Sequence, residues 1–215
     1  MIHAISGLYA VTPDDDDTPR LTALVESALA GGARLLQYRN KAATSASRLA
    51  QARALLALCR KFRVPFIVND HLKLALAVDA DGLHLGAEDG SLAAARARLG
   101  AGKILGASCY DRLELALEAV GRGADYVAFG SFFPSSVKRG AVCAPLDLLR
   151  AAKRRLSVPV VAIGGITPEN APQLIAAGAD GIAVVSALFG TADVGAAARR
   201  FSALFARREL ATGHS

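Results

Sequence analysis

The segment Phe66-Ile-Val-Asn-Asp70 is a short apolar run that ends in a carboxylate, and a second run of the same kind follows it. That run is Gly82-Leu-His-Leu-Gly-Ala-Glu-Asp89, and a single helix-length segment, Leu72 to Val78, separates the two. This order is typical of two parallel strands joined by a crossover helix. The C-terminal ends of such strands lie side by side, so residues that follow them are brought together.

Asp70 and Asp89 are therefore candidates for a common cation site at this edge of the sheet. Carboxylate oxygens favour a hard ion such as Mg²⁺, and no thiolate cluster accompanies them. The alternative is that each aspartate caps the helix that follows it, as aspartates after strands often do.

The same alternation of short β-rich runs and longer helical segments extends along the whole chain. The expected strands span residues 7–12, 35–39, 66–70, 82–86, 104–109, 126–130, 160–164 and 181–186. Between them, alanine- and leucine-rich segments with helical spacing include residues 21–30, 45–62, 112–122, 146–156 and 168–177. Glycines stop the helices in the related phrases Gly31-Gly-Ala-Arg34, Gly123-Ala-Asp125 and Ala177-Gly-Ala-Asp180.

Eight such units in 215 residues predict a single-domain (β/α)8 barrel, the TIM-barrel fold, with a parallel eight-stranded core. A doubly wound open sheet is the alternative, because it has the same alternation. We expect residues 1–209 to form the barrel domain and residues 210–215 a flexible C-terminal tail. In a barrel, functional groups lie at the C-terminal ends of the strands.

Several strand ends carry residues suited to binding anions. Arg39 and Lys41 follow the second strand, where an arginine fork and a lysine point charge can hold a polyanion. Asn69 precedes Asp70 on the third strand, and Ser108 lies near the end of the fifth. Each of these is also compatible with an ordinary polar loop.

The later strands predict a second anion site. An irregular segment of aromatic and hydroxyl residues, 130–140, follows the sixth strand and contains Lys138. Gly164 and Gly165 end the seventh strand, and Val185-Ser186 end the eighth. Backbone amides after strands seven and eight commonly form a phosphate site in this architecture, although a glycine pair alone also fits a tight turn.

The composition limits the other functions. The formal charge of +6 includes basic residues expected on solvated helix faces, and the absence of tryptophan gives little support to base stacking, so we expect no nucleic-acid partner. No apolar stretch is long enough for a membrane span, and no signal peptide is apparent, which predicts a cytoplasmic protein without a membrane partner. Three widely spaced cysteines favour free thiols.

Taken together in order, the motifs resemble the thiamine phosphate synthase family over nearly the whole chain. They are Leu8-Tyr-Ala-Val-Thr12, Gln37-Tyr-Arg-Asn-Lys41, Val68-Asn-Asp70, Asp81-Gly-Leu-His-Leu-Gly86 with Asp89, Gly106-Ala-Ser108, Ala124-Asp-Tyr-Val-Ala-Phe-Gly130 with Lys138, Val161-Ala-Ile-Gly-Gly-Ile166 and Val184-Val-Ser186. The resemblance implies a transferase that joins hydroxymethylpyrimidine diphosphate to a thiazole phosphate, releases diphosphate and uses Mg²⁺.

The resemblance also implies roles for individual residues. Asp70 and Asp89 would hold the magnesium, and Arg39, Ser108 and Lys138 would act in catalysis. The implied substrate-binding residues are Gln37, Tyr38, Arg39, Asn40, Lys41, Asn69, Ser108, Ser135, Ser136, Val137, Lys138, Gly165, Val185 and Ser186. The family's reaction is dissociative, so no protein nucleophile is assigned to Cys109 or His84.

The chain departs from the family pattern at a few positions. Asn40 stands where glutamate is common, Ala87 where glutamine is common, and Tyr110 lies near a position usually held by histidine. Ser135 and Val137 replace a threonine pair, so Val137 lacks one hydroxyl for the thiazole phosphate.

Two other functions remain open at this point. A paralogous thiazole tautomerase would bind a thiazole phosphate without the diphosphate-binding residues, and a non-catalytic barrel would only sense a phosphorylated metabolite. The presence of Arg39, Lys41, Asn69, Asp70, Asp89 and Lys138 favours the synthase. The sequence leaves open whether the chain forms a homo-oligomer.

Overall fold

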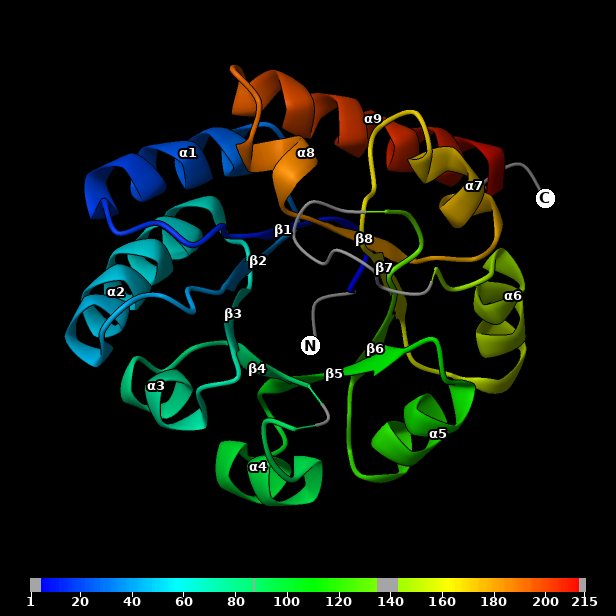
Figure 1. The fold of residues 1–215 in the computed structure, drawn as a ribbon, viewed down its shortest axis with the longest axis horizontal. Helices are drawn as coiled ribbons and strands as arrows, with labels where there is room; N and C mark the ends of the chain where they lie inside the picture. Colours follow the sequence, from blue (N-terminus) through cyan, green and yellow to red (C-terminus); the bar gives the residue numbers. More distant parts are fainter. Residues whose placement is uncertain (1–4, 87, 135–142, 213–215) are drawn as a thin grey trace.

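A closed barrel of parallel strands forms the centre of the molecule in the computed structural model, which describes residues 5–86, 88–134 and 143–212. The strands are β1 (Gly7–Val11), β2 (Leu35–Tyr38), β3 (Phe66–Asn69), β4 (Gly82–Leu85), β5 (Ile104–Tyr110), β6 (Tyr126–Phe129), β7 (Val160–Ile163) and β8 (Gly181–Val184). They pair in chain order, and β8 closes the barrel against β1 (Figure 1). The predicted (β/α)8 fold is confirmed, and the open-sheet alternative is excluded.

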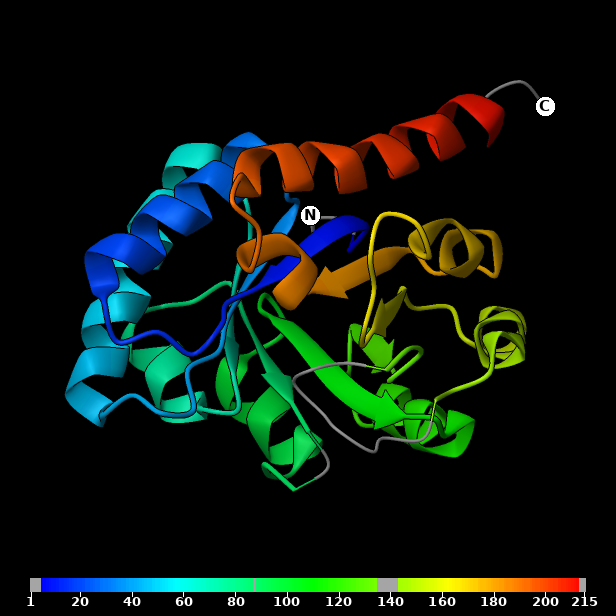
Figure 2. The same ribbon diagram turned by 45° about the horizontal axis from the view of Figure 1, so that its top comes forward.

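Helices surround the barrel, and those between successive strands form the crossover connections (Figure 1). They are α1 (Thr18–Ala30), α2 (Ser45–Phe62), α3 (Leu72–Ala77), α4 (Leu92–Leu99), α5 (Leu113–Gly121), α6 (Leu146–Arg155), α7 (Ala171–Ala176), α8 (Ser186–Phe189) and α9 (Val194–Thr212). The long α9 lies beside α1 along one side of the barrel (Figure 2). Because α9 continues to Thr212, the helical part of the chain extends beyond residue 209.

Side chains alternate between two apolar layers along each strand. Tyr9 and Val11 point into the barrel, where they join an inner cluster with Leu35, Ile67, Ile104, Tyr126, Ala128, Val161 and Ala183. Leu8 and Ala10 belong to the larger outer cluster between the strands and the helices. Each fully buried aliphatic side chain contributes roughly 1.5–3 kcal/mol by leaving water, so this two-sided burial stabilises the barrel.

An aspartate directly before each of β4, β6 and β8 fastens the N-terminal end of the barrel. Asp180 illustrates the arrangement, because its Oδ2 accepts hydrogen bonds from the Val160 N–H of β7 at 2.8 Å and from Lys153 Nζ of α6 at 2.7 Å. Asp81 and Asp125 make equivalent contacts with backbone amides of β3 and β5 and with arginines of α2 and α4. Each aspartate thus connects the preceding strand to the helix that leads into that strand.

The cysteines agree with the expectation of free thiols. Cys59, Cys109 and Cys143 are all free thiols, the first two buried and the third exposed. No helix within the described residues has the length and apolar character needed to cross a bilayer.

Candidate active site

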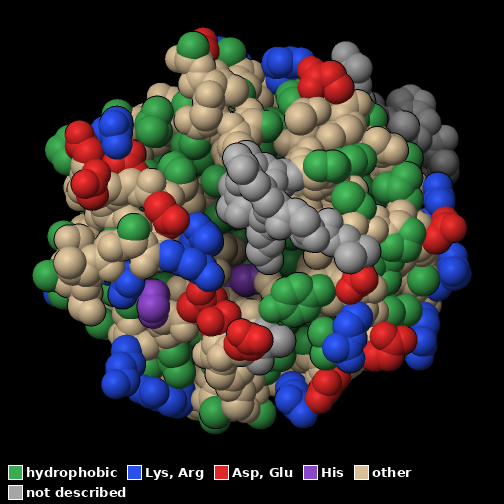
Figure 3. All heavy atoms as spheres, viewed as in Figure 1, with side chains coloured by type: hydrophobic (Ala, Val, Ile, Leu, Met, Phe, Trp, Pro, Cys, Tyr) green, Lys and Arg blue, Asp and Glu red, His purple; other side chains and the backbone are tan. Residues whose placement is uncertain are grey.

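A cavity of about 400 Å³ opens at the C-terminal ends of the strands. The space-filling view has a hollow near the middle of this face, with basic side chains on one side of it and acidic side chains next to them (Figure 3). The predicted site residues that line the cavity are Gln37, Arg39, Lys41, Asn69, Asp70, Asp89, Ser108, Gly165, Val185 and Ser186. The structure therefore brings these strand ends into one site.

Two predicted substrate-binding side chains do not line this cavity. Tyr38 points to the opposite side of the barrel wall from Gln37, packs against Phe66 and donates its hydroxyl to Gln51 Oε1 at 2.8 Å. Asn40 is buried and donates to the Asp15 carbonyl at 2.7 Å. Both side chains stabilise the loops after β1 and β2 and do not line the cavity, so we assign them no substrate contact. Ser135, Ser136, Val137 and Lys138 lie outside the described residues.

The two carboxylates of the expected metal site are neighbours. Asp70 begins the turn after β3 with a φ of 61° and donates its backbone N–H to the His84 carbonyl at 2.9 Å. Asp89 accepts the Gly86 N–H at 2.9 Å, which turns it back toward the strand end. Burial and the adjacent Asp89 carboxylate raise the pKa of Asp70 to about 6, while Lys41 opposes that shift. A cation or a proton is needed to relieve the repulsion between these two groups.

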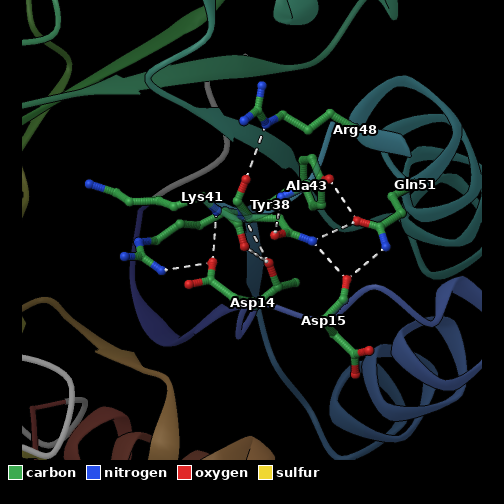
Figure 4. Close-up of polar contacts among 10 residues, drawn as sticks. Asp14, Asp15, Tyr38, Lys41, Ala43, Arg48 and Gln51 are labelled. Atoms are coloured by element: carbon green, nitrogen blue, oxygen red, sulfur yellow. Dashed lines mark hydrogen bonds and ion pairs between the residues drawn. The ribbon is translucent and has the colours of Figure 1, made fainter. Parts of the chain in front are cut away.

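Arg39 and Lys41 form the basic side of the cavity. Asp14 holds them in place, because its Oδ1 accepts a hydrogen bond from the Lys41 N–H at 2.8 Å and pairs with Arg39 Nη1 at 3.3 Å (Figure 4). The Thr12 hydroxyl also donates to the Arg39 carbonyl at 2.8 Å. These bonds fix the backbone that carries the two cations to the end of β1.

A buried amide supports the same loop from below. Gln51 of α2 accepts hydrogen bonds from the Tyr38 hydroxyl and from Asn40 Nδ2, and it donates to the Asp15 carbonyl at 2.9 Å (Figure 4). Arg48 Nε of the same helix donates to the Asn40 carbonyl at 3.1 Å. The loops after β1 and β2 are thus joined through α2, which restricts the motion of Arg39 and Lys41.

The opposite wall of the cavity is built from backbone. Gly164 and Gly165 have φ angles of 103° and 63°, a region that favours glycine. A Cβ on Gly165 would lie 2.4 Å from the Pro134 carbonyl oxygen, so a side chain cannot be accommodated there. Val185 and Ser186 complete this wall at the start of α8. The two sides of the cavity therefore differ in chemistry, one with charged side chains and the other with exposed backbone.

A polar cluster at the cavity floor was not predicted. His84, which is 6% exposed, contacts the Tyr126 hydroxyl through Nδ1 and Ser108 Oγ through Nε2, both at 2.9 Å. Burial lowers the pKa of His84 to about 4, so the imidazole is neutral near pH 7. Tyr9 joins the cluster through its hydroxyl, 2.7 Å from that of Tyr126. The inward face of β1 and β4, read with a period of two, was the sequence signal for Tyr9 and His84.

The barrel and its cavity define the class of protein: a (β/α)8 barrel with a cavity lined by charged side chains at the C-terminal ends of its strands, which is where enzymes of this fold have their active sites. A family model described as thiamine monophosphate synthase matches residues 8–188. The chain belongs to this thiamine-phosphate synthase family and is an enzyme of that type, a transferase.

Individual relatives agree with the family. The thiamine-phosphate synthase of Nitrosospira multiformis is 54% identical over 206 residues, which cover 96% of this chain and 88% of that protein. The enzyme of Methylobacillus flagellatus is 56% identical over 94% of this chain and 96% of its own length. The solved thiamine phosphate pyrophosphorylase of Pyrococcus furiosus superimposes with a TM-score of 0.84 at 39% identity, covering 94% of this chain and 96% of that one.

Proposed function

We propose that this chain condenses hydroxymethylpyrimidine diphosphate with a thiazole phosphate to give thiamine phosphate and diphosphate. The observation that carries the proposal is the asymmetry of the cavity. Arg39, Lys41 and the Asp70–Asp89 pair lie on one side and suit a metal-bound diphosphate. The glycine-rich backbone at Gly165 and Ser186 lies on the other side and suits a monophosphate.

Asp70 and Asp89 fit a magnesium ion as its protein ligands. Within the described residues, no group of three or more His, Cys, Asp or Glu side chains is arranged to hold a metal. Mg²⁺ is often held by only one or two carboxylates together with substrate phosphates and water, so two neighbouring carboxylates are sufficient. When bound, the ion would supply positive charge to the leaving diphosphate.

Arg39 and Lys41 would bind the same diphosphate from the protein side. Their positions are fixed by Asp14 and by the Thr12–Arg39 backbone contact, so little reorganisation is required as charge develops on the leaving group. Lys138, which lies outside the described residues, is assigned the same task by family resemblance. Gln37, Asn69 and Ser108 would contact the pyrimidine.

No protein nucleophile is needed in this reaction. The bond between the pyrimidine methylene carbon and the diphosphate oxygen breaks, and its electron pair leaves with diphosphate. The thiazole nitrogen then donates its lone pair to the methylene carbon. The nearby thiol of Cys109 is unsuited to attack, because it is 1% exposed and burial raises its pKa to about 12.

The thiazole phosphate would lie against the backbone of Gly165, Val185 and Ser186, and family resemblance adds Ser135, Ser136 and Val137. A cytoplasmic location remains a prediction, and the oligomeric state stays open. The proposed substrates are both small molecules.

An assay that omits each substrate in turn tests the proposal against its two alternatives. We expect thiamine phosphate only when both substrates are present. Isomerisation of the thiazole phosphate alone, without coupling, would instead identify a tautomerase. Saturable binding of either phosphorylated compound without any turnover would identify a sensor.

A further inference from the structure

A continuous chain of hydrogen bonds crosses the cavity floor from Gln37 to Ser108. Gln37 Nε2 donates to the Tyr9 hydroxyl at 2.9 Å, and this hydroxyl lies 2.7 Å from that of Tyr126. The Tyr126 hydroxyl contacts His84 Nδ1 at 2.9 Å, and His84 Nε2 contacts Ser108 Oγ at 2.9 Å. Gln37 and Ser108 both line the cavity, so these hydrogen bonds join two groups that face the same space.

The three inner groups of this hydrogen-bond network, Tyr9, Tyr126 and His84, can each donate only one hydrogen bond. Each tyrosine has one hydroxyl proton. The His84 imidazole is buried and its ring nitrogens contact hydroxyl groups and not carboxylates, which favours the neutral form with one N–H. Because Gln37 Nε2 donates to Tyr9, the Tyr9 proton is directed to Tyr126, and the Tyr126 proton is directed to His84 Nδ1. The imidazole proton is then on Nε2 and is donated to Ser108.

The two ends of this hydrogen-bond network therefore present different groups to the cavity, a donor at one end and an acceptor at the other. The Ser108 hydroxyl accepts from His84, its only side-chain hydrogen-bond partner among the described residues, so its own proton is directed to the cavity. Gln37 has turned its Nε2 to Tyr9 and presents Oε1 as an acceptor. The opposite direction of donation along the network would require the Gln37 amide to rotate by about 180°. Ser108 would then be the acceptor toward the cavity and Gln37 the donor.

We propose that Tyr9, Tyr126 and His84 are positioning residues that set this polarity, with Ser108 as donor and Gln37 as acceptor for one heterocyclic ligand. This inference rests on the proposed function and deepens it. The matching ligand has a ring nitrogen acceptor toward Ser108 and an N–H donor toward Gln37, which an aminopyrimidine provides. A pyrimidine with an oxo group and a protonated ring nitrogen offers the reverse pattern.

The barrel is built to hold these inner residues. Tyr126 is fully buried, and a Cβ on Gly106 would lie 2.1 Å from its Cζ, so only glycine at that position leaves room for the ring. The Tyr9 and Tyr126 rings meet edge to face with centroids 6.0 Å apart. Because these hydroxyls are buried, leaving one without a hydrogen-bond partner costs free energy, and this cost favours a single direction of donation along the network.

The first test compares two ligands in wild type and in Tyr126→Phe. We expect the wild type to bind the aminopyrimidine diphosphate substrate more tightly than its oxo analogue, as measured by calorimetry. Tyr126→Phe frees His84 to adopt either tautomer, so the ratio of the two affinities should fall by about five- to tenfold. In a Ser108→Ala background the same substitution should leave the ratio unchanged.

Tyr38→Phe is the matched control, because it also removes a buried tyrosine hydroxyl, but from the outer side of the barrel wall. It should leave the affinity ratio unchanged. An equal loss of affinity for both ligands in Tyr126→Phe would contradict the proposal, since that is the result of a merely structural role. If Tyr126→Phe does not fold, Tyr9→Phe is compared in the same way.

The second test needs no substrate. Nitrogen NMR of the ligand-free wild type should find His84 protonated on Nε2 and not on Nδ1, with the preference weakened in Tyr126→Phe. Protonation on Nδ1 in the wild type would overturn the inference. The expected tautomer and affinity ratio in a protein that forms no thiamine phosphate would leave the inference standing and reject the proposed function.

Discussion

Asp70 combines a left-handed backbone conformation with a carboxylate beside a second carboxylate, and both features point to a ligand. The φ of 61° directs the residue away from the β3 strand and into the cavity mouth. Its raised pKa reports an unfavourable negative charge in the metal-free protein. Helix capping, the alternative considered from sequence, finds no support at α3, where no side-chain cap is present.

Asp70→Asn should remove most of the turnover without loss of fold. The amide is similar in size but is a weaker ligand for a hard cation, so we expect kcat to fall about 100-fold or more at fixed Mg²⁺. The melting temperature of the metal-free protein should not decrease, because the substitution removes repulsion with Asp89. Asp111→Asn, at an exposed position after β5, should retain full activity in the same assay. Full activity of Asp70→Asn would mean that the metal site is wrongly assigned.

His84 should make stability depend on pH in the mildly acidic range. Burial lowers its pKa from 6.5 to about 4. Between these two pH values the histidine is protonated in the unfolded chain but neutral in the folded protein. This stability is fully present above about pH 6.5 and is lost as the pH falls toward 4. Between pH 7.5 and 5.0 the loss should be about 2 kcal/mol. Denaturant unfolding at both pH values should give a smaller loss for His84→Asn, and equal losses would contradict this account.

The N-terminal end of the barrel depends on the aspartates that precede β4, β6 and β8. Asp180→Ala would leave the buried Val160 N–H without its carboxylate acceptor and Lys153 without its partner. We expect a loss of about 1–3 kcal/mol in unfolding free energy. Asp147→Ala removes an aspartate that is 86% exposed and pairs only with Arg150 among the described residues, so its effect should stay within about 0.5 kcal/mol.

These two substitutions separate backbone support from ordinary surface charge. Neither residue lines the cavity, so turnover by the folded protein should not change in either variant. Similar stability losses in the two variants would show that the aspartates before the strands act only as surface charges.

At the scale of the whole molecule, strand periodicity was sufficient to predict the barrel. Eight apolar runs separated by helical segments leave few topologies, and the strand ends then identify the site. The bounds of α4, α8 and α9 were not predicted, and α4 in particular has an alanine- and arginine-rich sequence with little amphipathic character. Several of the basic residues on the predicted helix faces lie in surface ion pairs, including Arg60, Lys61, Lys153 and Arg200.

Orientation limited what the sequence could predict about individual site residues. Tyr38 follows Gln37 directly, and successive strand residues point to opposite faces, so only one of the two can face the cavity. The Tyr9–Tyr126–His84 cluster was missed because its members lie far apart in the chain. Their contacts arise only when β1, β4 and β6 face one another across the closed barrel.

Diphosphate release with both substrates present, measured across a Mg²⁺ titration that starts from chelated enzyme, tests most directly whether the protein is a magnesium-dependent synthase. We expect no release without Mg²⁺, and saturable release with it that matches thiamine phosphate in a one-to-one ratio. Full release in the presence of the chelator, or release without thiamine phosphate, would contradict this expectation.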